Sequence, residues 1–413
     1  MIIIFILTLL VIGYIISSNK EQLRLFLITF LISSVYIILT NLLIKNPNIE
    51  YFGDPDQPWF YSSAIEFSSY PVFEMFVEAF EKIEYLDLPL IMIWDGLIVK
   101  IAKLLGIDSI LLAWKLTNAC LVGIMAVVIY KIGLIFKIKP DFLFHNIILF
   151  ALFSPLLYES SQILRDIHVA LLYTIMLWLS LQNKAKTIIY LSIIALVLFF
   201  IRRESGMFSV VFFFIYIYSN FYTKRSSFVF IVGFVLCIGA ISFLSYFLDT
   251  MLNVLRGYNE MVQDSASNGS LGAMLDKFPF PLNLLAKFSF GNLMPFPIWH
   301  PVIGDDLGHS LRFVQMLTPI YWTPILYITL YYGVKEAKMI DKRIRLMIII
   351  AFVFMIIVSY GQGMTRRLLA VYPMILISYM YLVQNTAIDV KRFSNISYLC
   401  ITALHILYFF IKF

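Results

Sequence analysis

Long apolar runs separated by short polar segments dominate the chain. The apolar windows lie at approximately 1–17, 23–44, 110–136, 142–158, 167–182, 187–202, 206–221, 227–248, 316–334, 345–360, 368–384 and 395–412. A helix that crosses the hydrocarbon core of a bilayer needs about 20 mostly apolar residues. Because the windows are of that length or slightly shorter, the pattern predicts an all-α integral membrane protein with about twelve transmembrane helices.

Two long segments separate these windows, at approximately 45–109 and 249–315. From Ser62 to Glu84 apolar and acidic residues alternate at helical spacing, which predicts a helix lying on the membrane surface. Pro89 to Leu105 predicts a second interfacial helix, because a spanning helix there would invert every later loop. The prolines of the second segment exclude long helices in it.

The composition excludes an ordinary soluble protein. Of 413 residues, 61% are hydrophobic and 14% are charged, with a mean hydropathy of +0.88, whereas soluble domains are about half apolar and about a quarter charged. We find no soluble domain, linker or repeat, so residues 1–413 form one predicted membrane domain. The segment from Met1 lacks the features of a signal peptide and is expected to be a retained helix. Cys120, Cys237 and Cys400 lack metal or disulfide spacing and are expected to pack in helices.

The net charge of +6 is explained by short loops that alternate along the chain. The basic residues of these loops are Lys20, Arg24, Lys131, Lys137, Lys139, Lys184, Lys186, Lys224, Arg225, Lys335, Lys338, Lys342, Arg343, Arg345, Lys391 and Arg392. They all fall on one side if the windows span, and an excess of Lys and Arg marks the cytoplasmic side. Both termini and both long loops are therefore predicted to be extracytoplasmic, and the charge does not require a nucleic-acid partner.

An acidic pair follows the second window. Asp54 and Asp56 stand in Gly53-Asp-Pro-Asp-Gln-Pro-Trp-Phe-Tyr, close to the level of the lipid headgroups. Carboxylates there could act as a general base or bind a divalent cation. The alternative is an Asp-Pro turn with solvated carboxylates.

Arginines gather in the predicted outer turns, against the orientation rule. They are Arg165, Arg202, Arg203, Arg366 and Arg367, with Asp166 and Glu204 beside them. Guanidinium groups bind phosphate and pyrophosphate in a bidentate manner and stay charged. The cluster therefore predicts an anionic lipid-linked substrate, and the alternative is that each arginine pairs locally with a carboxylate or a carbonyl.

The second long loop supplies further candidates. His300 and His309 are the histidines of the outer loops, and His300 is a candidate proton acceptor. The aromatic residues of Met294-Pro-Phe-Pro-Ile-Trp-His, Trp299 among them, are expected to form a platform at the interface or against a sugar ring.

The order of these motifs resembles the bacterial surface-polysaccharide polymerases of the Wzy and EpsG type, and nearly as much the related GT-C membrane glycosyltransferases. The resemblance rests on Asp54, Asp56 and Tyr61 in an outer loop, Leu105-Gly-Ile-Asp-Ser, Ser154-Pro-Leu-Leu-Tyr, Leu164-Arg-Asp, Ile201-Arg-Arg-Glu and Thr365-Arg-Arg-Leu. It implies an enzyme of the bacterial inner membrane that polymerises undecaprenyl-pyrophosphate-linked repeat units for O-antigen or capsule, with a chain-length regulator as a partner.

The polymerase resemblance implies no cofactor and no obligatory metal. The arginines would hold pyrophosphate, Tyr61 and Trp299 would contact sugar, and Asp166, His300 or one of the acidic pair would accept the proton. The GT-C resemblance implies a polyprenyl-phosphate sugar donor, Asp54 or Asp56 as the base, and a divalent cation that could assist. A secondary transporter or a lipid-linked oligosaccharide flippase is the alternative from another class. The long outer loops and the missing repeat favour the transferase.

Overall fold

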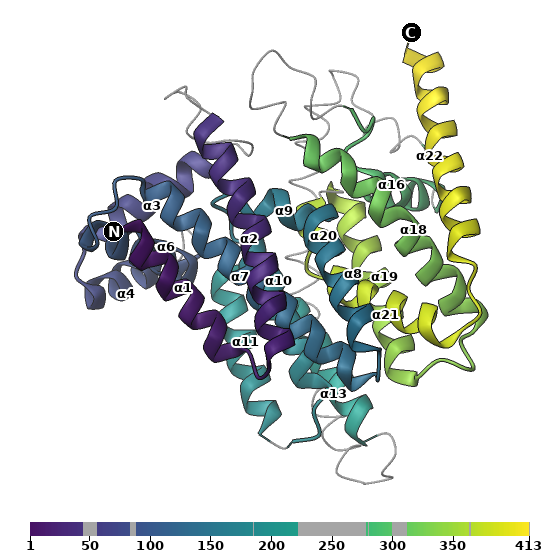
Figure 1. Cartoon of the computed structure of the whole chain (residues 1–413), viewed down its shortest axis with the longest axis horizontal. Helices are drawn as coiled ribbons and strands as arrows, with labels where there is room; N and C mark the ends of the chain where they lie inside the picture. Colours follow the sequence, from purple (N-terminus) through teal and green to yellow (C-terminus); the bar gives the residue numbers. More distant parts are fainter. Residues whose placement is uncertain are drawn as a thin grey trace.

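The computed structural model describes residues 1–43, 56–82, 88–184, 186–221, 278–279, 281–299, 312–362 and 365–412. These residues are mostly helical and contain no strand, so the all-α prediction is confirmed for the described part of the chain (Figure 1). The predicted window at 227–248 and the residues Asp54 and His300 lie outside it.

The first half of the chain begins with a helical hairpin and continues with helices of mixed length. These are α1 (Ile2–Ile16), α2 (Lys20–Leu43), α3 (Gln57–Ser69), α4 (Val72–Glu81), α6 (Pro89–Leu104), α7 (Ile110–Ile135), α8 (Pro140–Phe153), α9 (Pro155–Ser160), α10 (Asp166–Ser180), α11 (Thr187–Ile201), α12 (Arg203–Phe208) and α13 (Val210–Phe221). The second half contains α16 (Leu282–Leu293), α18 (Phe313–Lys335), α19 (Lys342–Gln362), α20 (Thr365–Leu368), α21 (Tyr372–Asn385) and α22 (Val390–Lys412).

Most predicted windows within the described residues coincide with one helix, and the windows 142–158 and 206–221 each fall on two. Among those residues, three helices are both long enough and apolar enough to cross a membrane: Lys20–Leu42, Ile110–Ile135 and Val390–Phe410. Shorter apolar helices are Ile2–Ile16, Pro140–Phe153, Asp166–Ser180 and Thr187–Ile201. This is the architecture of a membrane protein, while the total of about twelve spans stays a prediction.

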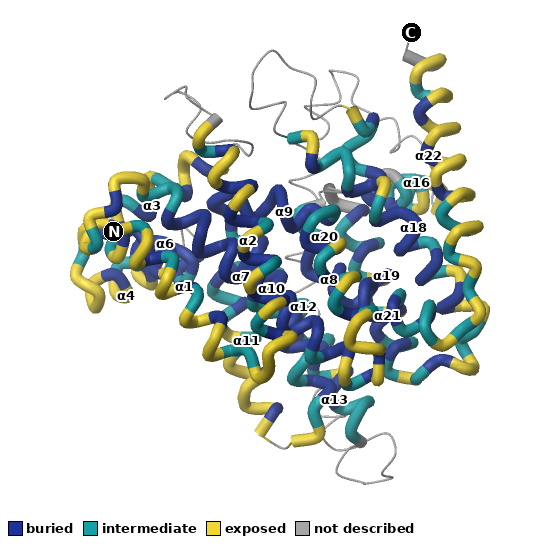
Figure 2. Tube along the Cα trace, in the orientation of Figure 1, coloured by how far each residue is buried: buried dark blue, intermediate teal, exposed yellow. Residues whose placement is uncertain are grey.

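Helix α7 forms the centre of the bundle and is buried along most of its length (Figure 2). It packs against α2 and α10. The ring of Phe26 on α2 fits where two glycines leave room, since a Cβ on Gly13 or Gly123 would lie 2.0 Å or 2.7 Å from it. Small residues let helices approach closely in membranes, where packing drives their association.

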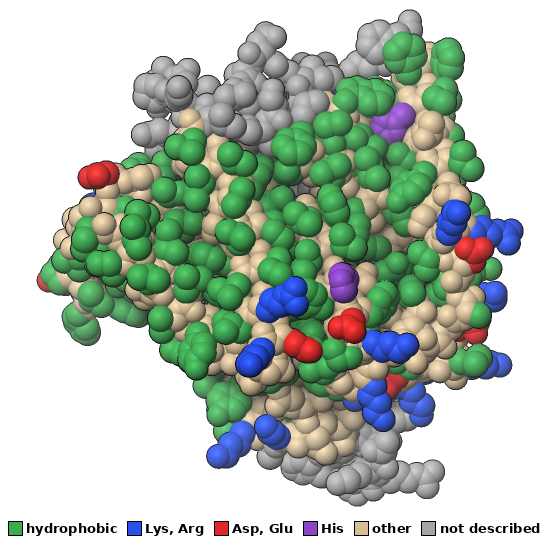
Figure 3. Space-filling view, viewed as in Figure 1, with side chains coloured by type: hydrophobic (Ala, Val, Ile, Leu, Met, Phe, Trp, Pro, Cys, Tyr) green, Lys and Arg blue, Asp and Glu red, His purple; other side chains and the backbone are tan. Residues whose placement is uncertain are grey.

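The outer surface is largely apolar, as expected of a surface solvated by lipid. Hydrophobic side chains, drawn in green, cover much of the face shown in Figure 3. Helix α22 is the extreme case, since Leu399 and Phe410 are 70% and 76% exposed. Exposed apolar area on this scale exceeds what soluble monomers show.

The basic loops come together at one end of the bundle, where blue side chains gather along the lower part of Figure 3. The ammonium of Lys131 donates a hydrogen bond to the Ile16 carbonyl at 3.0 Å, and the Lys139 N–H donates one to Gln384 Oε1 at 2.7 Å. The guanidinium of Arg343 lies over the Phe136 ring at 5.0 Å. We call this the basic end, and its assembly agrees with the loop alternation seen in the sequence.

Prolines divide two elements that the sequence pattern predicts as continuous. The interfacial helix predicted from Ser62 to Glu84 is two helices, because Pro71 has no N–H to donate and the residue before a proline disfavours helical backbone. The window 142–158 breaks in the same way between α8 and α9. There the Ser154 hydroxyl caps the new helix by accepting the Leu156 N–H at 3.2 Å.

Candidate functional site

Four segments from distant parts of the chain meet at the end of α10 that lies away from the basic end. They are the start of α3, the segment between α9 and α10, the junction of α11 and α12, and α20. The junction forms because Arg202 adopts extended backbone (φ −162°, ψ 110°), which ends α11 and starts α12. Gly206 then packs against α11, where a Cβ would lie 2.4 Å from the Phe199 Cα.

Arg202 bridges two carboxylates at this junction. Its guanidinium donates a hydrogen bond to Asp166 Oδ1 at 3.1 Å, and its Nε lies 3.7 Å from Glu204 Oε2. The side chains of Arg202 and Asp166 are only 12% and 8% exposed. Asp166 also stands in the first turn of α10, where the helix dipole favours a negative charge. Arg202 and Asp166 therefore form a buried ion pair.

Arg165 lies close to the same group of charges. Burial and the neighbouring Arg202 lower the pKa of Arg165 to about 10, while Asp166 and Glu204 oppose this effect and Arg367 adds to it. The guanidinium therefore remains charged at neutral pH. Burial by itself would raise the pKa of Glu204, but Arg202 and other groups outweigh it and lower that pKa below its ordinary value.

A second ion pair joins α20 to the start of α3. The guanidinium of Arg366 donates a hydrogen bond to Asp56 Oδ2 at 3.3 Å. The side chain of Arg366 is 17% exposed and that of Asp56 is 56% exposed. Asp56 is therefore more accessible than Asp166 and Glu204.

Buried amides fix the start of α3 to the segment before α10. Gln57 Nε2 donates to Gln162 Oε1 at 2.5 Å, and Gln57 Oε1 accepts the Ile163 N–H at 3.1 Å. Asn118 of α7 donates to the Gln162 carbonyl at 2.7 Å. All three amide side chains are fully buried. This network holds Asp56 beside the arginines without using the arginines themselves.

We define the arginine cluster as Arg165, Arg202, Arg366 and Arg367 together with Asp56, Asp166 and Glu204. The cluster thus brings four guanidinium groups and three carboxylates together. Arg203 follows in the chain, half-buried in the first turn of α12. Several guanidinium groups gathered in one site suit an anionic ligand.

The arginine cluster is recessed below the end of α7 that lies opposite the basic end. The ammonium of Lys131 on α7 lies over the Trp178 ring of α10, 5.7 Å from its centroid. These two residues therefore lie at the same height along the bundle, near the basic end. From Trp178 to Asp166, α10 rises about 18 Å, and there Asn118 contacts Gln162. Helix α7 continues for another ~12 Å to Ile110. The arginine cluster therefore lies roughly two helical turns short of that end of α7.

The structure places the other predicted site residues as follows. Tyr61 is half-buried on α3, one turn after Gln57, and packs against the apolar cluster that contains Phe60. Trp299 instead lies against α22, with its ring 5.1 Å from that of His405. His405 Nε2 also accepts the Ile298 N–H at 3.0 Å. Trp299 is thus tied to α22, and its sugar-binding role stays a prediction.

Sequence reasoning passed over Glu159, a second buried carboxylate of this region. Glu159 is 6% exposed on α9, the short helix that packs against α20. Together with Arg312 and Tyr158 it lies within electrostatic reach of Tyr36, whose side chain is hydrogen-bonded to that of Ser161. The signal available in the sequence was its position directly after Ser154-Pro-Leu-Leu-Tyr.

The described residues other than the arginine cluster include the buried His168 and no metal-binding group. His168 of α10 is buried, with its ring 5.8 Å from that of Trp94, and belongs to the packing of α6 on α10. No group of three or more His, Cys, Asp or Glu side chains arranged to hold a metal ion occurs in the described ranges.

Comparison of the chain with family models, with curated proteins and with solved structures finds no match in any of the three.

Proposed function

We propose that this protein is a membrane-embedded glycosyltransferase that polymerises undecaprenyl-pyrophosphate-linked oligosaccharide repeat units in surface-polysaccharide assembly. The observation that carries the proposal is the arginine cluster, at the end of the bundle away from the basic loops. Charged side chains inside a membrane bundle are costly unless they are paired or line a polar cavity, and they often mark a substrate path. A pyrophosphate attached to a lipid would accept charge-assisted hydrogen bonds from several guanidinium groups at once.

The proposed reaction is an inverting or retaining displacement at the anomeric carbon of the growing glycan. A hydroxyl of the next lipid-linked repeat unit forms the new C–O bond, and the bond between the anomeric carbon and the pyrophosphate oxygen breaks. Undecaprenyl pyrophosphate leaves with the electron pair, held by Arg165, Arg366 and Arg367, whose positive charges stabilise it. A carboxylate of the cluster or His300 accepts the hydroxyl proton.

The same proposal predicts on which side of the membrane the arginine cluster lies. With the basic end in the cytoplasm, as its excess of Lys and Arg predicts, the arginine cluster faces the extracytoplasmic side of a bacterial inner membrane. Lipid-linked repeat units would reach it there from the outer leaflet.

The accessible carboxylate of Asp56 favours a second candidate, a GT-C transferase that uses a polyprenyl-phosphate sugar donor. In that enzyme Asp56 or Asp54 would be the general base, and a divalent cation could assist. The ion pair between Asp56 and Arg366 places a carboxylate beside a guanidinium, which is compatible with either function.

The test is polymer formation by the purified protein in detergent, supplied with a lipid-linked repeat unit. Arg366→Ala should abolish long polymer, while Arg366→Lys should retain part of it, because Lys keeps the charge but loses the bidentate fork. Arg392→Ala is the matched control, since Arg392 is exposed at the basic end. Long polymer from Arg366→Ala would remove this arginine from the site.

The requirement for a polyprenyl-phosphate sugar donor distinguishes the polymerase from the GT-C transferase. A polymerase lengthens the repeat unit without an added polyprenyl-phosphate sugar, and Asp56→Asn weakens the glycan ladder without eliminating it. A transferase that uses Asp56 as its base would lose about 10²–10⁴-fold in rate with the same substitution. Strict dependence on the sugar donor, with addition of a single sugar, would select the transferase.

A further inference from the structure

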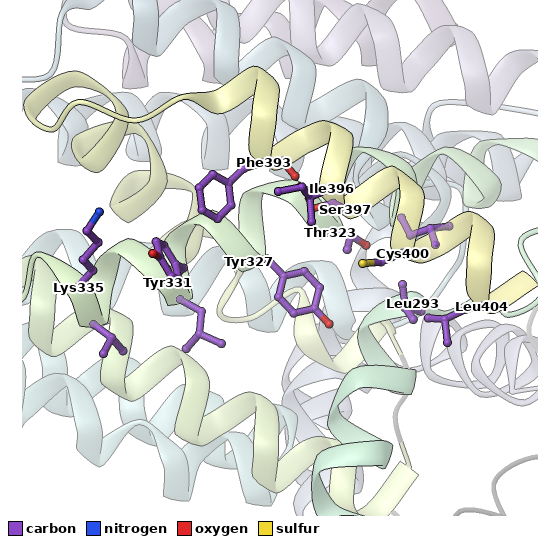
Figure 4. Close-up of a pocket in the computed structure, with 13 residues that line it drawn as sticks. Leu293, Thr323, Tyr327, Tyr331, Lys335, Phe393, Ile396, Ser397, Cys400 and Leu404 are labelled. Atoms are coloured by element: carbon purple, nitrogen blue, oxygen red, sulfur yellow. The ribbon is translucent and has the colours of Figure 1, made fainter.

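A lateral crevice separates α18 from α22. It has a volume of about 800 Å³ and is lined almost entirely by apolar side chains. Figure 4 shows Lys335 at one end and Leu293 and Leu404 at the other, with Tyr327 between them. None of these residues belongs to the arginine cluster.

Two contacts join α22 to the rest of the bundle, one towards each end of the crevice. Near the basic end, the ring of Phe393 on α22 packs against Tyr331 and Tyr332 of α18, with centroid distances of 5.1 Å and 5.3 Å. Towards the other end of α22, His405 is fixed by the segment before Trp299. Helix α22 is one of the long apolar helices in the described part of the chain that can cross a membrane.

The crevice opens sideways towards the surrounding lipid. Tyr331 and Val334 on its rim are 49% and 72% exposed. From Thr323 to Lys335, α18 rises about 18 Å, while one leaflet accounts for half of a hydrocarbon core that is about 30 Å thick. The crevice therefore has the length of one acyl chain that enters from the leaflet at the basic end.

Charge at the mouth of the crevice indicates which headgroup fits. The ammonium of Lys335 is held over the rings of Tyr331 and Tyr332, at 5.8 Å and 5.5 Å from their centroids. Lys391 and Arg392 begin α22 at the same end. Basic pockets between transmembrane helices on this side of a membrane bind anionic headgroups.

We propose that the crevice is a binding site for an anionic phospholipid, with one acyl chain between α18 and α22 and the lipid phosphate at Lys335. The occupant comes from the leaflet at the basic end. The proposal does not depend on glycosyl transfer, because it uses no residue of the arginine cluster.

Native mass spectrometry of the full-length protein in detergent tests this proposal. The protein is titrated with phosphatidylglycerol and with phosphatidylcholine of identical chains. Phosphatidylglycerol should bind about fivefold more tightly, in line with ~1 kcal/mol per basic residue at the surface. Lys335→Gln should remove this preference. Lys338→Gln is the matched control and should keep it, because Lys338 does not line the crevice.

A second variant tests the chain rather than the headgroup. Cys400 lines the crevice from α22 and is a free, exposed thiol, so Cys400→Trp should fill the space and lower binding of both lipids. Cys400→Ser should bind as the unmodified protein does. Arg366→Ala should also bind phosphatidylglycerol normally, which separates this site from the glycosyl-transfer proposal.

Three results would overturn the assignment. The first is an equal loss of preference in Lys335→Gln and Lys338→Gln, which would indicate general surface attraction. The second is unchanged lipid binding in Cys400→Trp. The third is displacement of phosphatidylglycerol by an undecaprenyl phosphate that binds more tightly, which would identify the crevice as a site for the carrier lipid.

Discussion

A single arginine determines how the charges of the site are arranged. Arg202 contacts both Asp166 and Glu204, while Arg165 and Arg367 lie near the same carboxylates. Because Arg202 is already paired and buried, it serves mainly to shape the site. Under the proposed function, the guanidinium groups of Arg165, Arg366 and Arg367 would hold the phosphate, and substitutions should separate the two roles.

The first prediction concerns the buried pair of Arg202 and Asp166. Removing one partner of a buried pair leaves an uncompensated charge and costs roughly 3–5 kcal/mol. Asp166→Ala should therefore lower the free energy of unfolding by about 3 kcal/mol, measured by chemical denaturation in micelles. The double variant Asp166→Ala/Arg202→Ala should lose less than the sum of the single variants.

The control for this cycle is Glu81→Ala, an exposed position at the end of α4 where surface substitutions change stability by less than about 0.5 kcal/mol. Strictly additive losses in the double variant would show that Asp166 and Arg202 are not coupled energetically, whatever their distance.

The elements were predictable from the sequence wherever an apolar run was uninterrupted. Prediction and structure agree closely for 110–136 and α7, because this run has no internal proline and Ser109 caps its start. Agreement fails at Pro71 and Pro155, where the apolar pattern continues through a backbone break. Apolar periodicity reports which face is buried and carries no information about a missing N–H.

The site was predictable as a set of residues but not as a geometry. The excess of arginines in outer turns follows from the orientation rule. The pairing of Asp56 with Arg366 joins residues that are 310 positions apart, so spacing alone could not predict it. Glu159 was passed over because its burial depends on α2 and α18, which are remote in the sequence.

The second prediction concerns the start of α19. Asp341 Oδ1 accepts the Arg343 N–H at 2.8 Å, as an N-cap does, and its carboxylate also pairs with the Arg343 guanidinium at 2.8 Å. Asp341→Ala should lower the free energy of unfolding by about 1 kcal/mol at pH 7. Asp341→Asn should recover part of the loss, since Asn also caps but cannot pair with Arg343.

The stability difference between the protein and Asp341→Ala should also depend on pH, in a direction set by the pKa of Asp341. Burial by itself would raise the pKa of Asp341, but the hydrogen bonds and charge of Arg343 outweigh it and lower the pKa. A carboxyl whose pKa is lowered in the folded state contributes stability above its unfolded pKa of about 3.9 and loses it as the pH falls through the folded pKa. The difference between the protein and Asp341→Ala should therefore be constant near neutrality and shrink below about pH 4. A difference that grows towards low pH would contradict this account.

At the scale of the whole molecule, the two ends of the bundle carry different kinds of charge. The basic end holds mostly lysines and arginines in short loops that contact one another, such as Lys131 with Ile16 and Lys139 with Gln384. The other end holds arginines that are half-buried and lie among carboxylates. The excess of Lys and Arg in the loops of the first end predicts the orientation of the bundle, whereas the arginines of the second end are already stabilised by carboxylates and would in addition bind the ligand under the proposed function.

The third prediction is therefore the orientation of the bundle. In a variant without the native cysteines (Cys120→Ala, Cys237→Ala and Cys400→Ala), single cysteines are introduced at Ser69 and at Lys338, both exposed. A membrane-impermeant maleimide should label Ser69→Cys in intact cells, because the neighbouring Ser68 accepts a hydrogen bond from Lys103, shortly before the start of α7 at the end opposite the basic end. It should label Lys338→Cys only after the membrane is permeabilised, because Lys338 follows α18 at the basic end.

Labelling in the opposite sense would place the arginine cluster in the cytoplasm, where repeat units joined outside the cell could not reach it, and the polymerase proposal would fall together with the orientation.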